Sequence, residues 1–133
     1  MTSLNSRVWP GASPTELNGV RVLIVEDSWD VGMGLKSMLE AWGADIVGLV
    51  ATSDDAMRLV AEHTPDVALV DVNLRNGEKS YGLIDRLYEQ GTRIVVMSGY
   101  ANVPLAKGKA VAILQKPIQE EVLLASLRPA ATE

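Results

Sequence analysis

The sequence predicts an α/β fold: one five-stranded parallel sheet with helices on both of its faces. Three observations carry this prediction. Five short runs of apolar residues have the length of strands, amphipathic segments alternate with them, and the connections between the two are short. Alternation of this kind produces a mostly parallel sheet, because each crossover helix packs back onto it. With 133 residues, the chain is long enough for one domain with a hydrophobic core.

The predicted strands are continuous apolar runs, which is typical of strands buried on both faces. They cover residues 20–27, 44–51, 65–73, 93–99 and 110–117. The third run, PDVALVDVN, places Asp71 at the end of a strand that should be buried. An ionised carboxylate is costly to bury unless a partner compensates its charge, so Asp71 requires an explanation from its neighbours.

The predicted helices cover residues 29–42, 53–63, 83–90 and 119–127, and the segment 100–109 allows only a short or irregular helix because it contains Pro and Gly. Ser28 is expected to cap the first helix and Gly43 to end it, while Ser53 is the expected cap of the second. Helical spacing predicts a core-facing set in the first helix. These residues are Val31, Leu35, Met38, Leu39 and Trp42.

Composition restricts the class of protein. The net charge of -5 argues against general nucleic-acid binding, and the lack of cysteine excludes disulfides and thiolate metal sites. We find neither a membrane span nor a secretion signal, which favours a cytoplasmic protein. We predict a flexible N-terminal tail over residues 1–18, one domain over 19–129 and a short C-terminal tail over 130–133.

The carboxyl ends of the predicted strands carry polar residues. Glu26 and Asp27 follow the first strand, Asp71 ends the third, Ser98 the fourth and Lys116 the fifth. Parallel strands bring these ends to one edge of the sheet, where ligands bind in open α/β folds. Crowded carboxylates repel one another, and a divalent ion such as Mg²⁺ relieves that repulsion. Together with a hydroxyl and an ammonium, they predict a phosphoryl-transfer site with an aspartate nucleophile.

In these residues the sequence resembles the receiver domains of two-component response regulators. The matching segments are VED, LVDVN, VVMSGYA and LQKP, in the family's order and at the ends of the corresponding strands. The resemblance implies a flavodoxin-like, doubly wound fold. It also implies that Asp71 accepts a phosphoryl group from the phosphohistidine of a sensor histidine kinase or histidine phosphotransfer protein. The bond between Lys116 and Pro117 resembles the family's cis peptide.

The resemblance implies a role for each site residue. Asp27 would bind Mg²⁺ directly, Glu26 through water, and Asn73 through its backbone carbonyl, with Asp71 as the remaining carboxylate ligand. After transfer, Ser98 and Lys116 would each contact a phosphoryl oxygen. The protein would then act by binding a downstream protein, as a monomer or weak dimer, and would not be an enzyme in the ordinary sense.

The sequence departs from the usual family pattern at several positions. Ile113 stands where the family usually carries an aromatic residue on the last strand, and the interval from Ser98 to Lys116 is short by roughly one helical turn. The loop NLRNGEKSYG resembles that of an atypical group of stand-alone receivers found in alphaproteobacteria. We therefore expect phosphorylation to reorder the segment from Tyr100 to Lys109, and we expect this segment to form the surface that binds the partner protein.

Two other classes of function, an interaction module and an enzyme, are possible on this fold class. A degenerate receiver would act as an interaction module without phosphorylation, or as a phosphate sink, but it would be expected to lack Asp71 or Lys116. An aspartate-based phosphatase needs a second Asp where Asn73 stands, and a dinucleotide-binding dehydrogenase needs a Gly-rich turn after the first strand. Because the chain stops soon after the last predicted helix, we expect output through a partner.

Three further residues were assigned structural positions. His63 is predicted at the surface between a helix and a strand, and Trp29 and Trp42 are predicted to pack the first helix. Trp29 also lies close enough in sequence to Glu26 and Asp27 to shape the access of a partner to the acidic residues.

Overall fold

The computed structural model describes residues 16–74, 77–99, 103 and 108–128, and it confirms the predicted alternation of strands and helices. The strands are β1 (Arg21–Val25), β2 (Asp45–Val50), β3 (Val67–Asp71), β4 (Arg93–Ser98) and β5 (Ala112–Gln115). The helices are α1 (Trp29–Ala41), α2 (Ser53–Glu62), α3 (Tyr81–Glu89) and α4 (Glu120–Leu127). Most of the segment 100–109, including Tyr100, lies outside the described residues.

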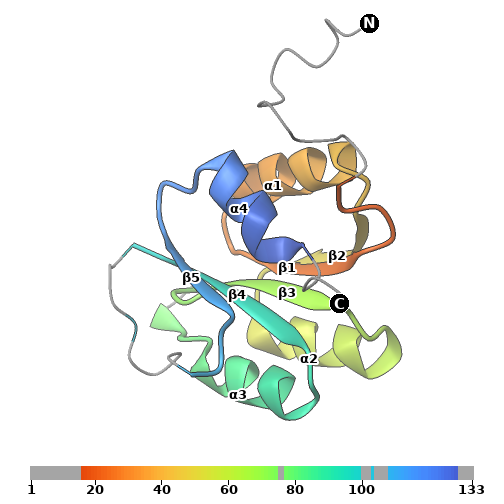
Figure 1. Cartoon of the computed structure of the whole chain (residues 1–133). Helices are drawn as coiled ribbons and strands as arrows, with labels where there is room; N and C mark the ends of the chain where they lie inside the picture. The colour runs from red at the N-terminus through yellow and green to blue at the C-terminus, as the bar shows by residue number, and fades with distance from the viewer. Residues whose placement is uncertain (1–15, 75–76, 100–102, 104–107, 129–133) are drawn as a thin grey trace, which may run out of the picture.

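The five strands form one parallel sheet in the order β2-β1-β3-β4-β5. Helices α1 and α4 cover one face, and α2 and α3 cover the other (Figure 1). The strand order reverses between β1 and β3, so the crevice at their carboxyl ends is the expected ligand position. The predicted fold class is confirmed, and this crevice is where Glu26 and Asp71 emerge.

Each face of the sheet has its own hydrophobic cluster, because side chains alternate between the faces along a strand. In β1, Val22 and Ile24 pack toward α1 and α4, and Leu23 and Val25 toward α2 and α3. Leu17 is fully buried, although it falls within the predicted N-terminal tail. Its N–H donates to the carbonyl of Trp42 at 2.8 Å, so the packed structure includes residues before the predicted boundary.

Helix α1 begins and ends as predicted, but its orientation differs. Ser28 Oγ accepts the N–H of Val31, and Gly43 follows the helix with a φ of 95°, a conformation that favours glycine. Val31 is 45% exposed, so the prediction that it faces the core is wrong. Trp29 is 68% exposed and does not pack the helix as predicted, whereas Trp42 is buried. Gly32 faces the sheet instead, where an added Cβ would approach Leu49 Cδ1 to 2.7 Å.

The cap of helix α2 is also displaced by one residue from the prediction. Thr52 Oγ1 accepts the N–H of Asp55 at 3.1 Å, so Thr52 and not Ser53 is the N-cap. Ser53 occupies the first helical position, and its N–H donates to Glu78 Oε2 at 3.2 Å. Within the described part of the chain, no helix is both long and apolar enough to span a membrane.

Candidate functional site

Two carboxylates are buried where the central strands end. Asp71 is the last residue of β3 and Glu26 directly follows β1, and their exposed fractions are only 4% and 3%. β1 and β3 are neighbours in the sheet, so the two side chains emerge side by side. The predicted juxtaposition of Glu26 and Asp71 is therefore present in the structure.

Lys116 provides the positive charge at this edge. Its Nζ donates to Asp71 Oδ2 at 2.8 Å and to Glu26 Oε1 at 3.4 Å. Lys116 follows β5, and the Lys116–Pro117 peptide bond is cis, as predicted. The second oxygen of Glu26 accepts the N–H of Ser28 at 3.1 Å. One ammonium thus bridges two buried carboxylates, which answers in part why Asp71 can be buried.

The environment shifts the pKa of two of these groups. Burial raises the pKa of Glu26 above its ordinary value, and the nearby charge of Asp71 acts in the same direction. The N–H of Ser28 and the charge of Lys116 oppose this shift without cancelling it. For Lys116, burial alone would lower the pKa, but the hydrogen bond and charge of Asp71, helped by Glu26, raise it overall. Lys116 is therefore fixed as a cation.

Three carboxylates at this edge are arranged as a cluster of oxygen donors. Glu26, Asp27 and Asp71 each offer one carboxylate oxygen, and these oxygens lie within 4.8 Å of one another. Hard divalent cations such as Mg²⁺ prefer oxygen ligands, so the donor set fits that ion. Two of the three carboxylates are almost wholly buried, which makes their mutual repulsion costly without a compensating cation.

Ser98 and Asn73 also lie at this edge of the sheet. Ser98 is the last residue of β4, is fully buried, and accepts the N–H of Lys116 on its carbonyl at 2.7 Å. Asn73 donates its backbone N–H to Asp71 Oδ1 at 3.2 Å. All six residues assigned from the sequence are therefore gathered at one end of the sheet, although their individual roles remain predictions.

The structure adds residues that the sequence analysis did not single out. Ser80 is fully buried, and its hydroxyl donates to the backbone carbonyl of Asp71 at 2.8 Å. Lys79 forms an antiparallel bridge with Asn73, and its ammonium donates to the side-chain oxygen of Asn73. The loop after β3 thus folds back onto the end of that strand. Only its turn-forming composition was visible in the sequence.

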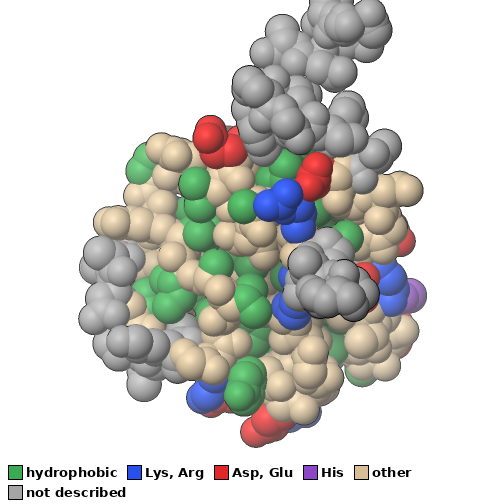
Figure 2. Space-filling model, viewed as in Figure 1, with side chains coloured by type: hydrophobic (Ala, Val, Ile, Leu, Met, Phe, Trp, Pro, Cys, Tyr) green, Lys and Arg blue, Asp and Glu red, His purple; other side chains and the backbone are tan. Residues whose placement is uncertain are grey.

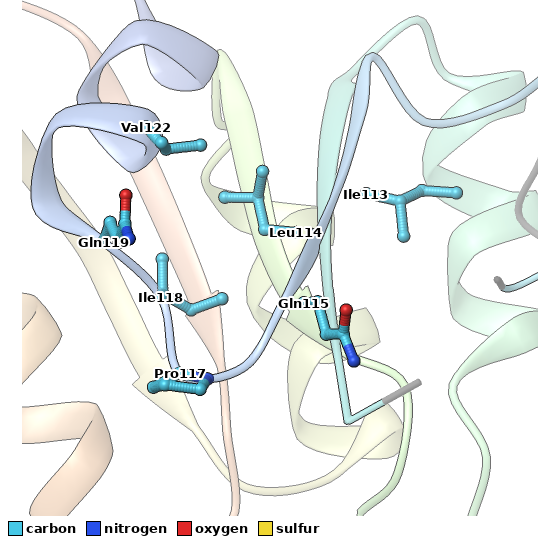
Figure 3. A pocket seen from close by; sticks show the side chains of 7 residues that line it. All are labelled: Ile113, Leu114, Gln115, Pro117, Ile118, Gln119 and Val122. Atoms are coloured by element: carbon cyan, nitrogen blue, oxygen red, sulfur yellow. The ribbon is translucent and has the colours of Figure 1, made fainter. Parts of the chain in front are cut away.

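Two surface pockets are lined in part by Pro117, the proline of the cis peptide bond. One, of about 330 Å³, lies between α1 and the residues after β5 and is lined mainly by apolar side chains, among them Val31, Met38 and Ile118. The other, of about 270 Å³, lies between β5 and the start of α4 (Figure 3). Leu114 and Ile113 point to opposite sides of β5 there, and Ile113 packs with the cluster on the α3 side.

The face formed by β5 and α4 has hydrophobic side chains at its surface (Figure 2). Among the described residues, Val111 is 56% exposed and Val122 is 43% exposed on these segments. Because β5 is an edge strand, its outer side is not covered by another strand. His63 lies elsewhere, after α2, and is exposed as predicted.

Comparison with known families identifies the family to which this fold belongs. The model of the response regulator receiver domain matches residues 22–128, which is most of the chain. The chain belongs to the response regulator receiver family. The match covers every strand and helix of the structure except the first residue of β1, and it includes all the site residues described above.

This receiver is similar to a curated relative from Mycobacterium tuberculosis, the transcriptional regulatory protein PdtaR. The two are 28% identical over 116 residues, which cover 84% of this chain and 57% of PdtaR. The receiver thus spans little more than half the length of that relative.

Solved structures support the same fold. A receiver domain of a modulated diguanylate cyclase from Desulfovibrio desulfuricans is 27% identical, with a TM-score of 0.70 over 80% of this chain and 88% of that one. A CheY-like receiver from Methylobacillus flagellatus is 26% identical, with a TM-score of 0.68 over 81% and 92%. The PhyR receiver domain of Erythrobacter litoralis is 22% identical, with a TM-score of 0.73 over 87% and 97%, which shows a shared fold.

Proposed function

We propose that this receiver accepts a phosphoryl group on Asp71 from a phosphohistidine of a sensor histidine kinase or histidine phosphotransfer protein. One observation carries the proposal: the Asp71 carboxylate is buried at the switch point of the sheet, 2.8 Å from the ammonium of Lys116 and within a cluster of acidic oxygens. Membership of the receiver family supports a role in phosphorylation-based signalling.

In the proposed reaction, a carboxylate oxygen of Asp71 forms a bond to phosphorus while the bond from phosphorus to the imidazole nitrogen breaks. The electron pair of that bond remains on the imidazole, which takes up one proton and leaves as neutral histidine. The carboxylate of Asp71 loses its negative charge when the acyl phosphate forms. The phosphoryl group adds a charge of about -1.5 to -2 at pH 7. The site must therefore stabilise more negative charge after transfer than before it.

The residues of the receiver divide this work among them. Lys116 neutralises one charge and fixes the Asp71 carboxylate, and the N–H of Asn73 fixes its other oxygen. Glu26, Asp27, Asp71 and the carbonyl of Asn73 would hold Mg²⁺, which when bound supplies charge neutralisation for the transferring phosphoryl group. Ser98 supplies a hydroxyl donor at the end of β4 for a phosphoryl oxygen.

We propose that phosphorylation changes the binding of a downstream protein. The exposed side chains of Trp29 and Val31 lie directly after the acidic residues of the site, where a protein partner would approach Asp71. Large apolar side chains at the surface favour a protein as the partner. The proposal includes a switch that operates through the segment from Tyr100 to Lys109. Its motive is that Ile113 stands where the family usually carries an aromatic residue.

Intact-protein mass spectrometry tests the proposed function. The receiver is incubated with Mg²⁺ and acetyl phosphate, and wild type should gain one phosphoryl group. The variant Asp71→Asn should gain none and should keep its fold. The matched control is Asp66→Asn, at the opposite end of β3, which should be labelled like wild type. Labelling of Asp71→Asn at the wild-type level would contradict the assignment of the acceptor.

A further inference from the structure

The loop after β3 places a second cation on Asn73, two residues after the acceptor. Lys79 lies opposite Asn73 in an antiparallel bridge, and its ammonium donates to the side-chain oxygen of Asn73. Asn73 in turn donates its N–H to Asp71 Oδ1 at 3.2 Å. A chain of two hydrogen bonds thus connects Lys79 to the oxygen of Asp71 that Lys116 does not contact.

Backbone geometry supports this placement independently of any single side-chain contact. Val72 and Leu74 are buried in the hydrophobic cluster on the α2 and α3 side of the sheet, so the residues that alternate with them, Asp71 and Asn73, lie on the other side. Directly opposed residues of an antiparallel bridge also share a face, which adds Lys79 to that side. Residues of the other face are buried beneath the loop, as the pattern requires. They are Val72, Leu74 and Ser80.

Hydrogen bonds fix the loop in this position. Ser80 donates its N–H to the carbonyl of Val72 at 3.0 Å, and Leu74 donates its N–H to the carbonyl of Glu78 at 2.7 Å. The Ser80 hydroxyl also donates to the carbonyl of Asp71, and Glu78 accepts the N–H of Ser53 from α2. The backbone that carries Lys79 is therefore attached to both β3 and α2.

The charge at the site explains what a second cation does there. Before transfer, three carboxylates would be balanced by one divalent ion and the ammonium of Lys116. After transfer, the charge of Asp71 is replaced by a phosphoryl group of about -1.5 to -2, so the balance becomes more negative by up to about one charge. Among the described basic residues, several are engaged elsewhere. Lys36 pairs with Glu40, and Lys109 with Asp85.

We propose that Lys79 is a second phosphoryl-binding cation, whose ammonium moves from the side-chain oxygen of Asn73 to an oxygen of the phosphoryl group on Asp71. This inference rests on the proposed function of Asp71. A lysine ammonium binds phosphate as a compact point charge on a flexible stem, which suits a change of partner by side-chain rotation. Before transfer, the ammonium is bound by the neutral amide oxygen of Asn73. A charged phosphoryl oxygen binds an ammonium more strongly than a neutral amide oxygen does, so the ammonium should change partner after transfer.

Beryllofluoride, which mimics a phosphoryl group on a carboxylate, provides the probe. The affinity of the Mg²⁺-loaded receiver for beryllofluoride is measured by fluorine NMR for wild type, Lys79→Met and Lys79→Arg. Lys79→Met should weaken binding about fivefold, the size expected for one partly exposed charged hydrogen bond, whereas Lys79→Arg should stay within about twofold of wild type. Lys36→Met, which removes a lysine from an ion pair on α1, should bind like wild type.

A second readout follows the amide of Asn73. In wild type, its side-chain NH2 resonances should shift when the adduct forms, because the ammonium leaves the amide oxygen, and in Lys79→Met this shift should be much smaller. If wild type forms no adduct, or Asp71→Asn forms one equally well, the proposed function fails. If wild type forms the adduct and Lys79→Met binds it equally tightly, the proposed function stands and the inference about Lys79 is overturned.

Discussion

The two ends of the sheet use charged residues in different ways. At the amino end, Arg93 donates to the backbone carbonyls of Leu127 and Arg128 at 3.1 and 2.8 Å, and Asp66 accepts the N–H of Arg21 at 2.9 Å. These charged groups meet neutral backbone partners, and the ion pair that Arg128 forms with Glu16 nearby is partly exposed to solvent. At the carboxyl end, charged groups meet one another: Lys116 bridges two buried carboxylates, and burial raises the pKa of Glu26.

The two ends therefore differ in whether their charges are balanced locally. Charged side chains that bind backbone groups at a surface attach one segment to another and can remain hydrated on their other sides. The buried carboxylates have more negative charge than the lysine between them can neutralise, which costs stability in the absence of a cation. An excess of buried negative charge is typical of a site that binds a cation, which is the role proposed for this cluster.

The largest expected effect comes from Lys116→Met. This change leaves Asp71 and Glu26 buried without their ammonium, so we expect the free energy of unfolding to fall by about 2 kcal/mol. The value is below the usual cost of breaking a buried ion pair because the lysine side chain is 34% exposed. The protein should also fail to retain a phosphoryl group. Urea unfolding in metal-free buffer and mass spectrometry measure the two effects.

Arg93→Met is the counterpart at the amino end. It removes two hydrogen bonds to carbonyls at the surface, so about 1 kcal/mol should be lost, and phosphoryl labelling should be unchanged. If the two variants lose equal stability and both retain labelling, the contrast between the two ends is wrong.

A smaller effect is expected from Asp27→Ala, which removes one oxygen donor from the acidic cluster. At a Mg²⁺ concentration of ten times its Kd, wild type should gain about 1.4 kcal/mol of stability, and the variant should gain much less. In metal-free buffer the variant should be at least as stable as wild type, because repulsion among the carboxylates decreases. Thermal unfolding with and without Mg²⁺ measures both, and an identical Mg²⁺ response in the two proteins would remove Asp27 from the metal site.

The strand ends were predictable from the sequence because two strong patterns agree there. Continuous apolar runs identify buried parallel strands, and their alternation with helices places every carboxyl end at one edge. That reasoning located Glu26, Asp71 and Lys116 without any knowledge of their contacts. The contacts with Mg²⁺ and a phosphoryl group remain predictions.

Other features were not predictable because they depend on packing. Hydrophobic spacing favours Val31 for the core, whereas the structure turns Gly32 toward the sheet, where a larger residue would require the Leu49 side chain to shift. Thr52 and Ser53 are both good cap residues, and the backbone path selects the first. The contacts of Lys79 and Ser80 arise from the loop folding back on β3, which composition alone does not specify.

The smallest expected effect concerns the pH dependence of stability and isolates the burial of Glu26. Because the pKa of Glu26 is raised in the folded state, the folded protein binds this proton more tightly than the unfolded chain. The favourable contribution of Glu26 to the free energy of unfolding is complete below its pKa in the unfolded chain, 4.5. It is lost as the pH rises through the pKa of Glu26 in the folded protein. Glu26→Gln stays neutral and can still accept the N–H of Ser28, so it should lack this loss. In metal-free buffer its stability relative to wild type should rise between pH 4.5 and 7, as measured by urea unfolding at several pH values. Saturating Mg²⁺ should reduce or reverse that advantage, because the ion favours the charged carboxylate. If the stability difference between Glu26→Gln and wild type stays constant across this pH range, the burial of Glu26 does not oppose its ionisation. The charges at the carboxyl end would then be as well compensated as those at the amino end.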